Sequence, residues 1–333
     1  MRIKQKEFNL DIGKAIFLPI PIYRKKYIYS DDMLINKVLL ERIEEKKRLI
    51  DAKRPLPKDV IKKLKDELKI LHAYHSNAIE GNTLTLAETK IVIEGGITVG
   101  GKPLKDCLEA RNTAKAYELI EKIAKGKKKI SHETIQQIHE ALTRGILEDA
   151  GKYRTQNVRI VDAKKTPPDF TKILRLIDEL IINIKNSKAH PIETSAFLHH
   201  KLTEMHPFVD GNGRTARLLS NLYLIKNGYP PIVLRVEDRA RYYRALRDAD
   251  SGNLAPFANF VAKAVNEALS HYLSIFGGDY ALLPLKELTR GTPYSQEYLS
   301  LRARQGKLDA VKIERTWYST KRAVREYVMM IKK

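Results

Sequence analysis

The sequence has little cysteine and no long apolar run, and each shortage excludes a class of protein. Cys107 is the single cysteine, so the chain forms neither an internal disulfide nor a zinc site built from its own cysteines. A short apolar run over 15–22 is interrupted by Pro19 and Pro21, and no segment approaches the ~18 apolar residues of a membrane-spanning helix. We therefore expect no transmembrane helix, no signal peptide and a cytoplasmic location.

Acidic residues are also scarce relative to basic ones. The 333 residues include 61 Lys and Arg but only 40 Asp and Glu, a net charge of +21. One interpretation is an anionic partner, and the other is a well-solvated, lysine-rich surface without a specific ligand. The length suits two or three domains with a substantial core.

Apolar residues mostly recur at three- and four-residue steps, which predicts a mainly helical protein. Helices are expected over 32–49, 59–81, 106–125, 131–143, 169–186, 191–205, 214–229, 237–248 and 254–275. Thr85 to Glu88 forms a capping box that opens a further short helix, which Gly95 and Gly96 end. Pro167 and Pro168 close a short β-like stretch.

One stretch, His206 to Arg217, concentrates the groups needed to handle nucleotide phosphates. It combines a base, a carboxylate that suits a hard metal ion, a glycine-bracketed turn and two guanidinium groups, namely His206, Asp210, Gly211, Asn212, Gly213, Arg214 and Arg217. The glycines allow successive backbone N–H groups to face one concavity at the start of the next helix, where the helix dipole favours anions.

Two other interpretations of this region fail on context. The spacing Gly211-x-Gly213-x-x-Ala216 matches a relaxed dinucleotide-binding fingerprint, but that motif follows a strand, and residues 193–205 have helical spacing. His199, His200, Glu204 and His206 suggest zinc, yet their order is not that of the metalloprotease motif His-Glu-x-x-His.

The stretch resembles the Fic family signature, His-x-Phe-x-Asp/Glu-Gly-Asn-Gly-Arg-x-x-Arg, at every specified position. The resemblance implies AMP transfer from ATP to a Ser, Thr or Tyr hydroxyl. His206 would be the base, Asp210 would hold Mg²⁺, and Phe208 would anchor the loop. The turn Gly211 to Gly213 would stabilise charge on the α-phosphate, Arg214 would neutralise the pyrophosphate and Arg217 would hold the γ-phosphate.

A second motif lies at the end of the helix predicted over 59–81. Ser76-x-x-x-Glu80-Gly81-Asn82 resembles the inhibitory motif that many Fic proteins carry before the core. The resemblance implies that Glu80 pairs with Arg217 in the place of the γ-phosphate, since guanidinium binds carboxylate and phosphate in a similar two-pronged manner.

The resemblance also assigns residues around the nucleotide and the target. It implies a β-hairpin flap near 158–168, including Val158 and Ile160, that holds the target peptide by strand addition. Tyr243, and less firmly Tyr242, would surround the adenine ring. Asp250 stands where close relatives have Asn, which puts one ribose or adenine contact in doubt.

The last 50 residues have a different character. Short helices over 285–290 and 295–305, a strand–turn–strand over 308–320 and a final helix over 321–330 resemble an excisionase-like winged helix-turn-helix. Residues 281–333 hold twelve Lys and Arg against five Asp and Glu, a net charge of +7, which suits duplex DNA. Arg302 and Arg304 are the expected groove residues, although such domains also dock proteins.

We therefore predict three parts: 1–109 with the inhibitory helix, a Fic core over 110–276 and a winged helix over 281–333. The predicted function is autoinhibited AMP transfer from ATP, with Mg²⁺, to another protein or to the chain itself, in a homodimer. Removal of AMP by the same site, and a DNA-binding regulator with a nucleotide-sensing core, are the alternatives. Gly213 argues against a kinase-like branch, which has Lys at that position.

Overall fold

The computed structural model describes residues 33–331 except 160–164, 291 and 314, and it is mainly helical, as predicted. Its helices are α1 (Lys37–Asp51), α2 (Lys58–Ile79), α3 (Leu86–Gly95), α4 (Leu104–Lys125), α5 (His132–Thr143), α6 (Ile173–Asn186), α7 (Pro191–Met205), α8 (Asn212–Lys226), α9 (Arg239–Asp250), α10 (Ala255–Ser274), α11 (Leu285–Leu288), α12 (Gln296–Arg304) and α13 (Lys321–Ile331). Three 3₁₀ turns are η1 (Phe170–Lys172), η2 (Val236–Asp238) and η3 (Gly278–Tyr280), and the strands are β1 (Leu283–Pro284), β2 (Ala310–Ile313) and β3 (Thr316–Ser319).

Several helices begin at the capping side chains from which their starts were predicted. Ser131 accepts a hydrogen bond from the Thr134 N–H and starts α5, and Thr85 and Glu88 form the expected capping box of α3. Helix α8 begins two residues earlier than predicted, because Gly211 takes φ +78° at the N-cap and Asn212 already belongs to the first turn. Glycine allows that left-handed conformation at little cost.

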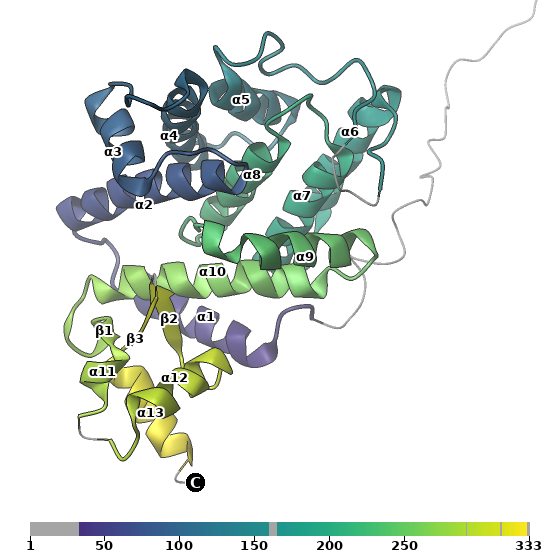
Figure 1. Cartoon of the computed structure of the whole chain (residues 1–333). Helices are drawn as coiled ribbons and strands as arrows, with labels where there is room; N and C mark the ends of the chain where they lie inside the picture. The colour runs from purple at the N-terminus through teal and green to yellow at the C-terminus, as the bar shows by residue number, and fades with distance from the viewer. Residues whose placement is uncertain (1–32, 160–164, 291, 314, 332–333) are drawn as a thin grey trace, which may run out of the picture.

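The main body is organised around α8, which packs against α2, α4, α5 and α7. Most of α7 and α8 is buried, including charged and polar residues as well as apolar ones. Helix α10 crosses the base of this bundle and packs against α1, α7 and α9 (Figure 1). The active-site candidates therefore lie on two central helices whose positions are fixed from several sides.

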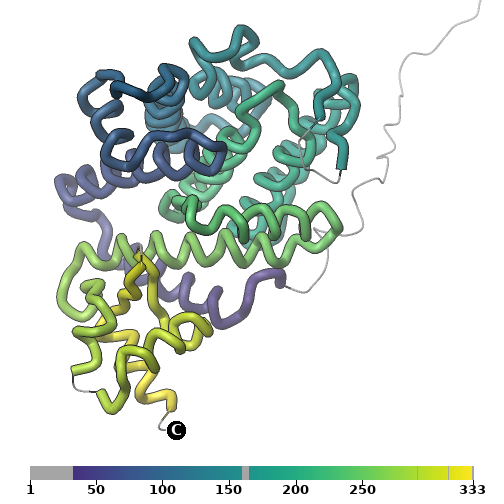
Figure 2. Tube along the Cα trace, in the orientation of Figure 1, coloured from purple at the N-terminus to yellow at the C-terminus, as the bar shows by residue number. Residues whose placement is uncertain are grey.

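The C-terminal unit has a small core of its own, formed by α11, α12, α13 and the sheet. The sheet is antiparallel in the order β1-β3-β2, and Val311 pairs with Tyr318 in its register. The strand–turn–strand over 308–320 was predicted, whereas β1 was not, because two residues carry no periodic signal. Figure 2 places this yellow unit beside the purple helix α1.

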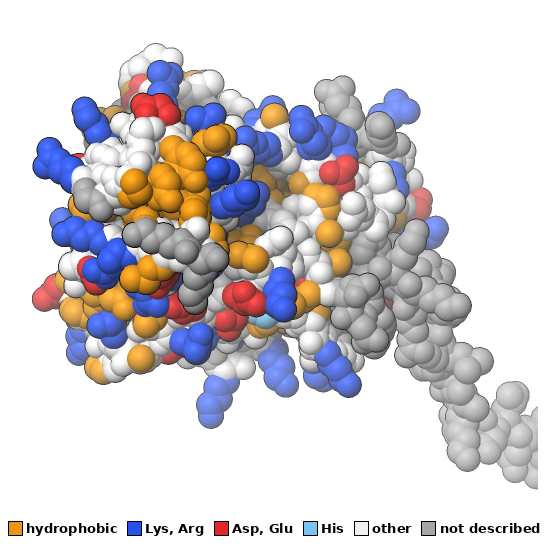
Figure 3. Space-filling view, turned by 90° about the horizontal axis from the view of Figure 1, so that it is seen from below, with side chains coloured by type: hydrophobic (Ala, Val, Ile, Leu, Met, Phe, Trp, Pro, Cys, Tyr) orange, Lys and Arg blue, Asp and Glu red, His pale blue; other side chains and the backbone are white. Residues whose placement is uncertain are grey.

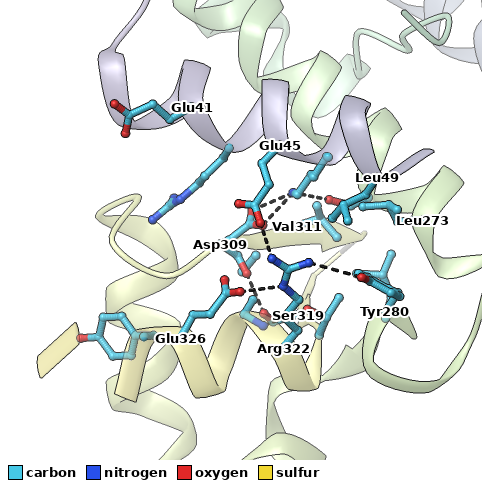
Figure 4. Close-up of a pocket in the computed structure, with 18 of the residues that line it drawn as sticks. Glu41, Glu45, Leu49, Leu273, Tyr280, Asp309, Val311, Ser319, Arg322 and Glu326 are labelled. Carbon is cyan, nitrogen blue, oxygen red and sulfur yellow. Dashed lines mark hydrogen bonds and ion pairs between the residues drawn. The ribbon is translucent and has the colours of Figure 1, made fainter. Parts of the chain in front are cut away.

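Charged side chains join the C-terminal unit to α1 and α10. Lys46 contacts Asn266, Ser270 and Asp309, with a Lys46 Nζ to Asp309 Oδ2 distance of 2.7 Å. Figure 4 shows Arg322 reaching Glu45, Glu326 and the hydroxyl of Tyr280 beside a cavity of about 410 Å³. The unit is thus held by directional polar contacts.

The surface of the C-terminal unit is mixed in character. Figure 3, which views the molecule from below Figure 1, shows apolar side chains gathered between Lys and Arg side chains. Its exposed apolar residues include Leu301, Met329, Met330 and Ile331. Basic and apolar side chains are therefore interspersed on this surface.

The hairpin predicted near 158–168 is not found in the part of that stretch that the structure describes. Residues 151–159 and 165–169 contain no strand, while Ile160 and most of the predicted tip lie outside the described residues. Asn157 instead donates to the Asp169 carboxylate and accepts from the Phe170 N–H, which holds the two sides together.

Within the described residues, no helix is both long enough and apolar enough to cross a bilayer.

Candidate active site

His206 stands at the end of α7, in the loop that leads to α8. It has φ 49° and is the one residue other than glycine with a positive φ among the described residues. The backbone of Arg154 donates to the Pro207 carbonyl at 2.9 Å, and the Arg154 Nε donates to the His206 carbonyl at 2.8 Å. These contacts hold a conformation that L-residues rarely adopt.

The ring of His206 has the proton arrangement of a base. Its Nδ1 lies 3.1 Å from the Thr203 carbonyl, which can only accept, so Nδ1 carries the proton and Nε2 has the free lone pair. Burial lowers the pKa of His206, although the Thr203 hydrogen bond opposes this, and the nearby positive charge of Arg154 lowers the pKa further. The imidazole therefore stays neutral, and able to accept a proton, at neutral pH.

The loop is closed by Asn212 and Phe208. The Asn212 side chain accepts from the Phe208 N–H and donates to the Phe208 carbonyl, both at 2.9 Å. Phe208 is fully buried and stacks on His139, with ring centroids 3.7 Å apart. The anchoring role expected of Phe208 fits this burial, but the Asn212 side chain is occupied by the loop, so at Asn212 we expect the backbone N–H to meet a phosphate.

His139 fixes the carboxylate-bearing residue Asp210. Its Nδ1 accepts from the Gly151 N–H at 2.9 Å, which leaves Nε2 to donate to the Asp210 carbonyl at 2.9 Å. Burial lowers the pKa of His139 to about 4, so the ring is neutral and this tautomer is the one present. The Asp210 side chain itself remains half exposed, with 50% of its surface accessible.

Arg214 is buried at the first turn of α8 with part of its hydrogen-bonding capacity unused. Its Nη1 lies 2.8 Å from Glu109 Oε1 and its Nη2 lies 3.7 Å from Asp210 Oδ2. The close approach to Glu109 is not aligned as a hydrogen bond, and Nε and Nη1 have no hydrogen-bond partner. Unpartnered buried donors beside an accessible carboxylate suit a phosphate group with a bound Mg²⁺.

Arg217 lies one turn further along α8 and is bound by the end of α2. Its Nη2 is 2.7 Å from Glu80 Oε1, its Nε donates to Ser76 Oγ at 2.8 Å and its Nη2 also donates to the Ser76 carbonyl. The ion pair raises the pKa of Arg217 despite its burial. A Cβ added to Gly213 would overlap Glu80 Oε1, so this carboxylate lies directly against the glycine turn.

The two tyrosines expected around adenine occupy different environments. Tyr242 is 1% exposed, and its hydroxyl lies 2.8 Å from His199 Nε2 and 3.4 Å from Arg217 Nη1. Its ring is enclosed beneath Arg217, which its hydroxyl contacts, so its place beside the adenine stays a prediction. Tyr243 is half-buried, with the Arg239 guanidinium 4.9 Å from its ring centre, and remains available to a base.

The residue that departs from the family pattern, Asp250, is also engaged within the protein. His200 Nε2 lies 2.9 Å from Asp250 Oδ1, and Lys165 contacts the Asp250 carbonyl. Glu204 lies close to both residues, which makes a group with metal-ligand atoms. Lys201 and Lys165 already pair with Glu204, so the local charge is balanced without a cation.

The remaining predicted residues lie apart from this loop. Val158 is half-buried beside the Arg154 contacts. Arg304 is exposed at the end of α12, whereas Arg302 is partly buried, stacks on Tyr298 with 4.6 Å to the ring centre and donates to Gln305. Of the two arginines, Arg304 is therefore the more accessible, and Arg302 is engaged by its neighbours.

Sequence reasoning overlooked four residues that hold the site together: Arg154, His139, Glu109 and His199. Each lies outside the signature and acts through contacts that depend on the fold. A Gly-x-Tyr-Arg stretch and a histidine on an apolar helix face were visible in the sequence, but neither pattern specifies a partner.

Comparison with known proteins agrees with the fold. The Fic/DOC family model matches residues 129–224. A protein named protein adenylyltransferase Fic from Nematostella vectensis is 34% identical over 243 residues, which cover 72% of this chain and 57% of that protein. A solved structure of Fic-1 from Caenorhabditis elegans is 30% identical, covers 72% of this chain and 73% of its own, and has a TM-score of 0.65. The chain belongs to the Fic/DOC family.

A further solved structure extends the similarity of fold beyond the main body. A Fic family protein from Desulfovibrio desulfuricans is 24% identical, with a TM-score of 0.61, and covers 89% of this chain and 98% of its own. That coverage exceeds what residues 1–276 alone can supply. The chain spans about half the length of the curated relatives it matches.

Proposed function

We propose that this protein transfers AMP from ATP to a hydroxyl group of a protein, and that Glu80 represses the transfer. The observation that carries the proposal is the arrangement around α8. A neutral His206, a half-exposed Asp210 and the buried cations Arg214 and Arg217 flank one glycine turn. The names of the relatives support the same activity.

In the proposed reaction the target hydroxyl oxygen bonds to the α-phosphorus of ATP. The bond from this phosphorus to the oxygen that bridges to the β-phosphate breaks, and pyrophosphate leaves. His206 Nε2 accepts the hydroxyl proton, a contribution of about 10²–10⁴-fold in rate. The N–H groups at the start of α8 face the phosphates, since first-turn N–H groups have no partner within a helix.

Arg214 and Asp210 would divide the charge of the departing phosphates. Arg214 Nε has no hydrogen-bond partner, and the guanidinium, whose Nη1 is ion-paired with Glu109, would offset charge in the β-phosphate region. Asp210 would hold Mg²⁺, which would offset the negative charge of the phosphates. Tyr243 would pack against the adenine from the α9 side.

Repression follows from the occupation of Arg217. The Glu80 carboxylate lies where a γ-phosphate would bind Arg217, and it also lies against Gly213. Both anions cannot share one guanidinium at close range. ATP would then bind without its γ-phosphate in place, and the α-phosphorus would be misaligned for attack.

The test is labelling with α-³²P-ATP and Mg²⁺ in a host-cell lysate, using wild type, Glu80→Gly and Glu80→Gly/His206→Ala. The proposal expects strong labelling of protein bands by Glu80→Gly alone. Label retained by the double variant, or absent from all three, contradicts it. A loss of pre-installed label that requires Glu80 would favour the alternative, in which the same site removes AMP with Glu80 positioning water.

A second candidate function concerns the C-terminal unit, for which we propose a winged-helix interaction domain over 281–333. Its own core, three-stranded sheet and net charge of +7 support DNA binding. If the protein truncated after residue 276 bound duplex DNA at low salt as tightly as the full chain, DNA binding by this unit would be wrong.

A further inference from the structure

Arg154 is a buried cation whose donors are used by the main chain around the catalytic loop. It is 4% exposed, and among the described residues no carboxylate forms an ion pair with it. Its guanidinium instead donates to the carbonyls of His206, Gln156 and Pro168. A buried guanidinium whose nitrogens all donate to main-chain carbonyls indicates a structural role in holding those carbonyls in place.

The contacts of Arg154 connect three stretches of chain. Nε binds the carbonyl of His206, while Nη1 donates at 2.8 Å to the carbonyl of Gln156, which precedes residues 160–164. Nη2 binds the carbonyl of Pro168, which follows residues 160–164 in the sequence. Asn157, which precedes residues 160–164, adds a second link by donating to Asp169, which follows them.

The planar fork of arginine is needed for this connection. Its nitrogens point in fixed, divergent directions in one plane, so one side chain can reach three carbonyls that face different ways. Lysine keeps the charge but presents its donors from a single point on a flexible stem. The two side chains are therefore not equivalent at this position.

We infer that Arg154 is a positioning residue that fixes the main chain of His206 relative to both stretches that flank residues 160–164. This inference rests on the proposed function for its effect on rate, because those stretches border the segment expected to hold the target. One side chain thus links the main chain of the base to the stretches before and after residues 160–164.

The inference predicts a loss of rate with little loss of nucleotide binding. In the Glu80→Gly protein, Arg154→Lys lowers the initial rate of self-labelling from α-³²P-ATP by about tenfold to hundredfold, as expected for a small misplacement of reacting groups. The dissociation constant for ATP, measured by calorimetry, changes by less than about threefold, because Arg217 and Arg214 are untouched.

A matched control is Arg144→Met, which removes an arginine whose side chain is 74% exposed and whose ion-pair partner within the described chain is Glu140. Exposed pairs of this kind contribute little. Arg144→Met should keep the rate of the Glu80→Gly parent, and both variants are compared by melting temperature to show that they are folded.

Hydrogen–deuterium exchange provides a measurement that needs no activity. Arg154→Lys should speed exchange in peptides within 165–170 and 204–209 relative to its parent, whereas Arg144→Met should not. If exchange there is unchanged, or if Arg154→Lys keeps the parental rate, the inference is overturned. If the Glu80→Gly parent labels nothing, the proposed function fails, and the exchange result still decides the role of Arg154.

Discussion

At the scale of single residues, the neutral state of His206 has a measurable consequence. Burial and the charge of Arg154 lower its pKa below the ordinary value of 6.5. A base with a lowered pKa stays deprotonated as the pH falls, and activity is lost only when the pH passes through that lowered value. In the Glu80→Gly protein, the acidic midpoint of kcat/KM should therefore lie below pH 6.5.

The measurement is a pH profile of labelling at constant ionic strength. The negative charge of Glu80 raises the pKa of His206. The acidic midpoint of the Glu80→Gly profile should therefore lie at a lower pH than it would with Glu80 present. A midpoint above pH 6.5 would contradict the assignment of His206 as a buried neutral base.

The pair of Glu80 and Arg217 predicts a linked change in stability. Arg217 is 2% exposed, and loss of its carboxylate partner leaves a buried cation that only neutral groups contact. Glu80→Gly should lower the free energy of unfolding by about 1–3 kcal/mol, less than for a fully buried pair because Glu80 is partly exposed. ATP should then raise the melting temperature of Glu80→Gly more than that of wild type, as differential scanning fluorimetry would record. Equal shifts in both proteins would argue against competition for Arg217.

Sequence reasoning predicted which side chains lie together at this site better than it predicted the contacts of each one. The fixed spacing from His206 to Arg217 places both arginines on one side of α8, so their proximity followed from helix geometry. The burial of Tyr242 and the engagement of Asn212 by Phe208 depend on which helices surround the loop. Those contacts join residues distant in sequence, or a side chain to the backbone, and no pattern of residue types encodes them.

At the scale of the element, the end of α2 acts as one unit against Arg217. Ser76 contributes both its hydroxyl and its carbonyl, and only the hydroxyl is lost in Ser76→Ala. Loss of one such hydrogen bond costs about 1 kcal/mol. Ser76→Ala should therefore raise labelling a few-fold over wild type and remain below Glu80→Gly in the same assay. Labelling equal to that of Glu80→Gly would show that Ser76, rather than the carboxylate, is the main restraint.

Element boundaries were predictable where a side chain caps the helix. Ser131 and the box of Thr85 with Glu88 start α5 and α3 through their own hydrogen bonds, which are local in sequence. The described residues on either side of 160–164 contain no strand. They are held by contacts of Arg154 with Pro168 and of Asn157 with Phe170, which join a side chain to the backbone and which no pattern of residue types encodes.

At the scale of the whole molecule, the contact of Lys46 with Asp309 joins the C-terminal unit to α1. Lys46 is 9% exposed, so Asp309→Asn leaves a poorly solvated ammonium group that keeps Asn266 and Ser270 as neutral partners. We expect the free energy of unfolding to fall by about 1–3 kcal/mol. We also expect faster proteolysis near Gly277, measured by gel electrophoresis of the fragments. The control is Asp279→Asn, which breaks the exposed pair with Arg325 and should change neither measurement by much. Equal proteolysis of both variants would show that the junction does not depend on Lys46.

The central claim, that Glu80 takes the place of the γ-phosphate on Arg217, is tested most directly by calorimetric binding of ATP, ADP and AMP to wild type and Glu80→Gly. The account predicts that Glu80→Gly gains at least about tenfold in affinity for ATP, corresponding to about 1.4 kcal/mol. It predicts little gain for AMP, which lacks the phosphates that would reach Arg217. If the affinities for ATP and AMP rise equally, or if neither changes, Glu80 does not compete with the γ-phosphate and the proposed repression is wrong.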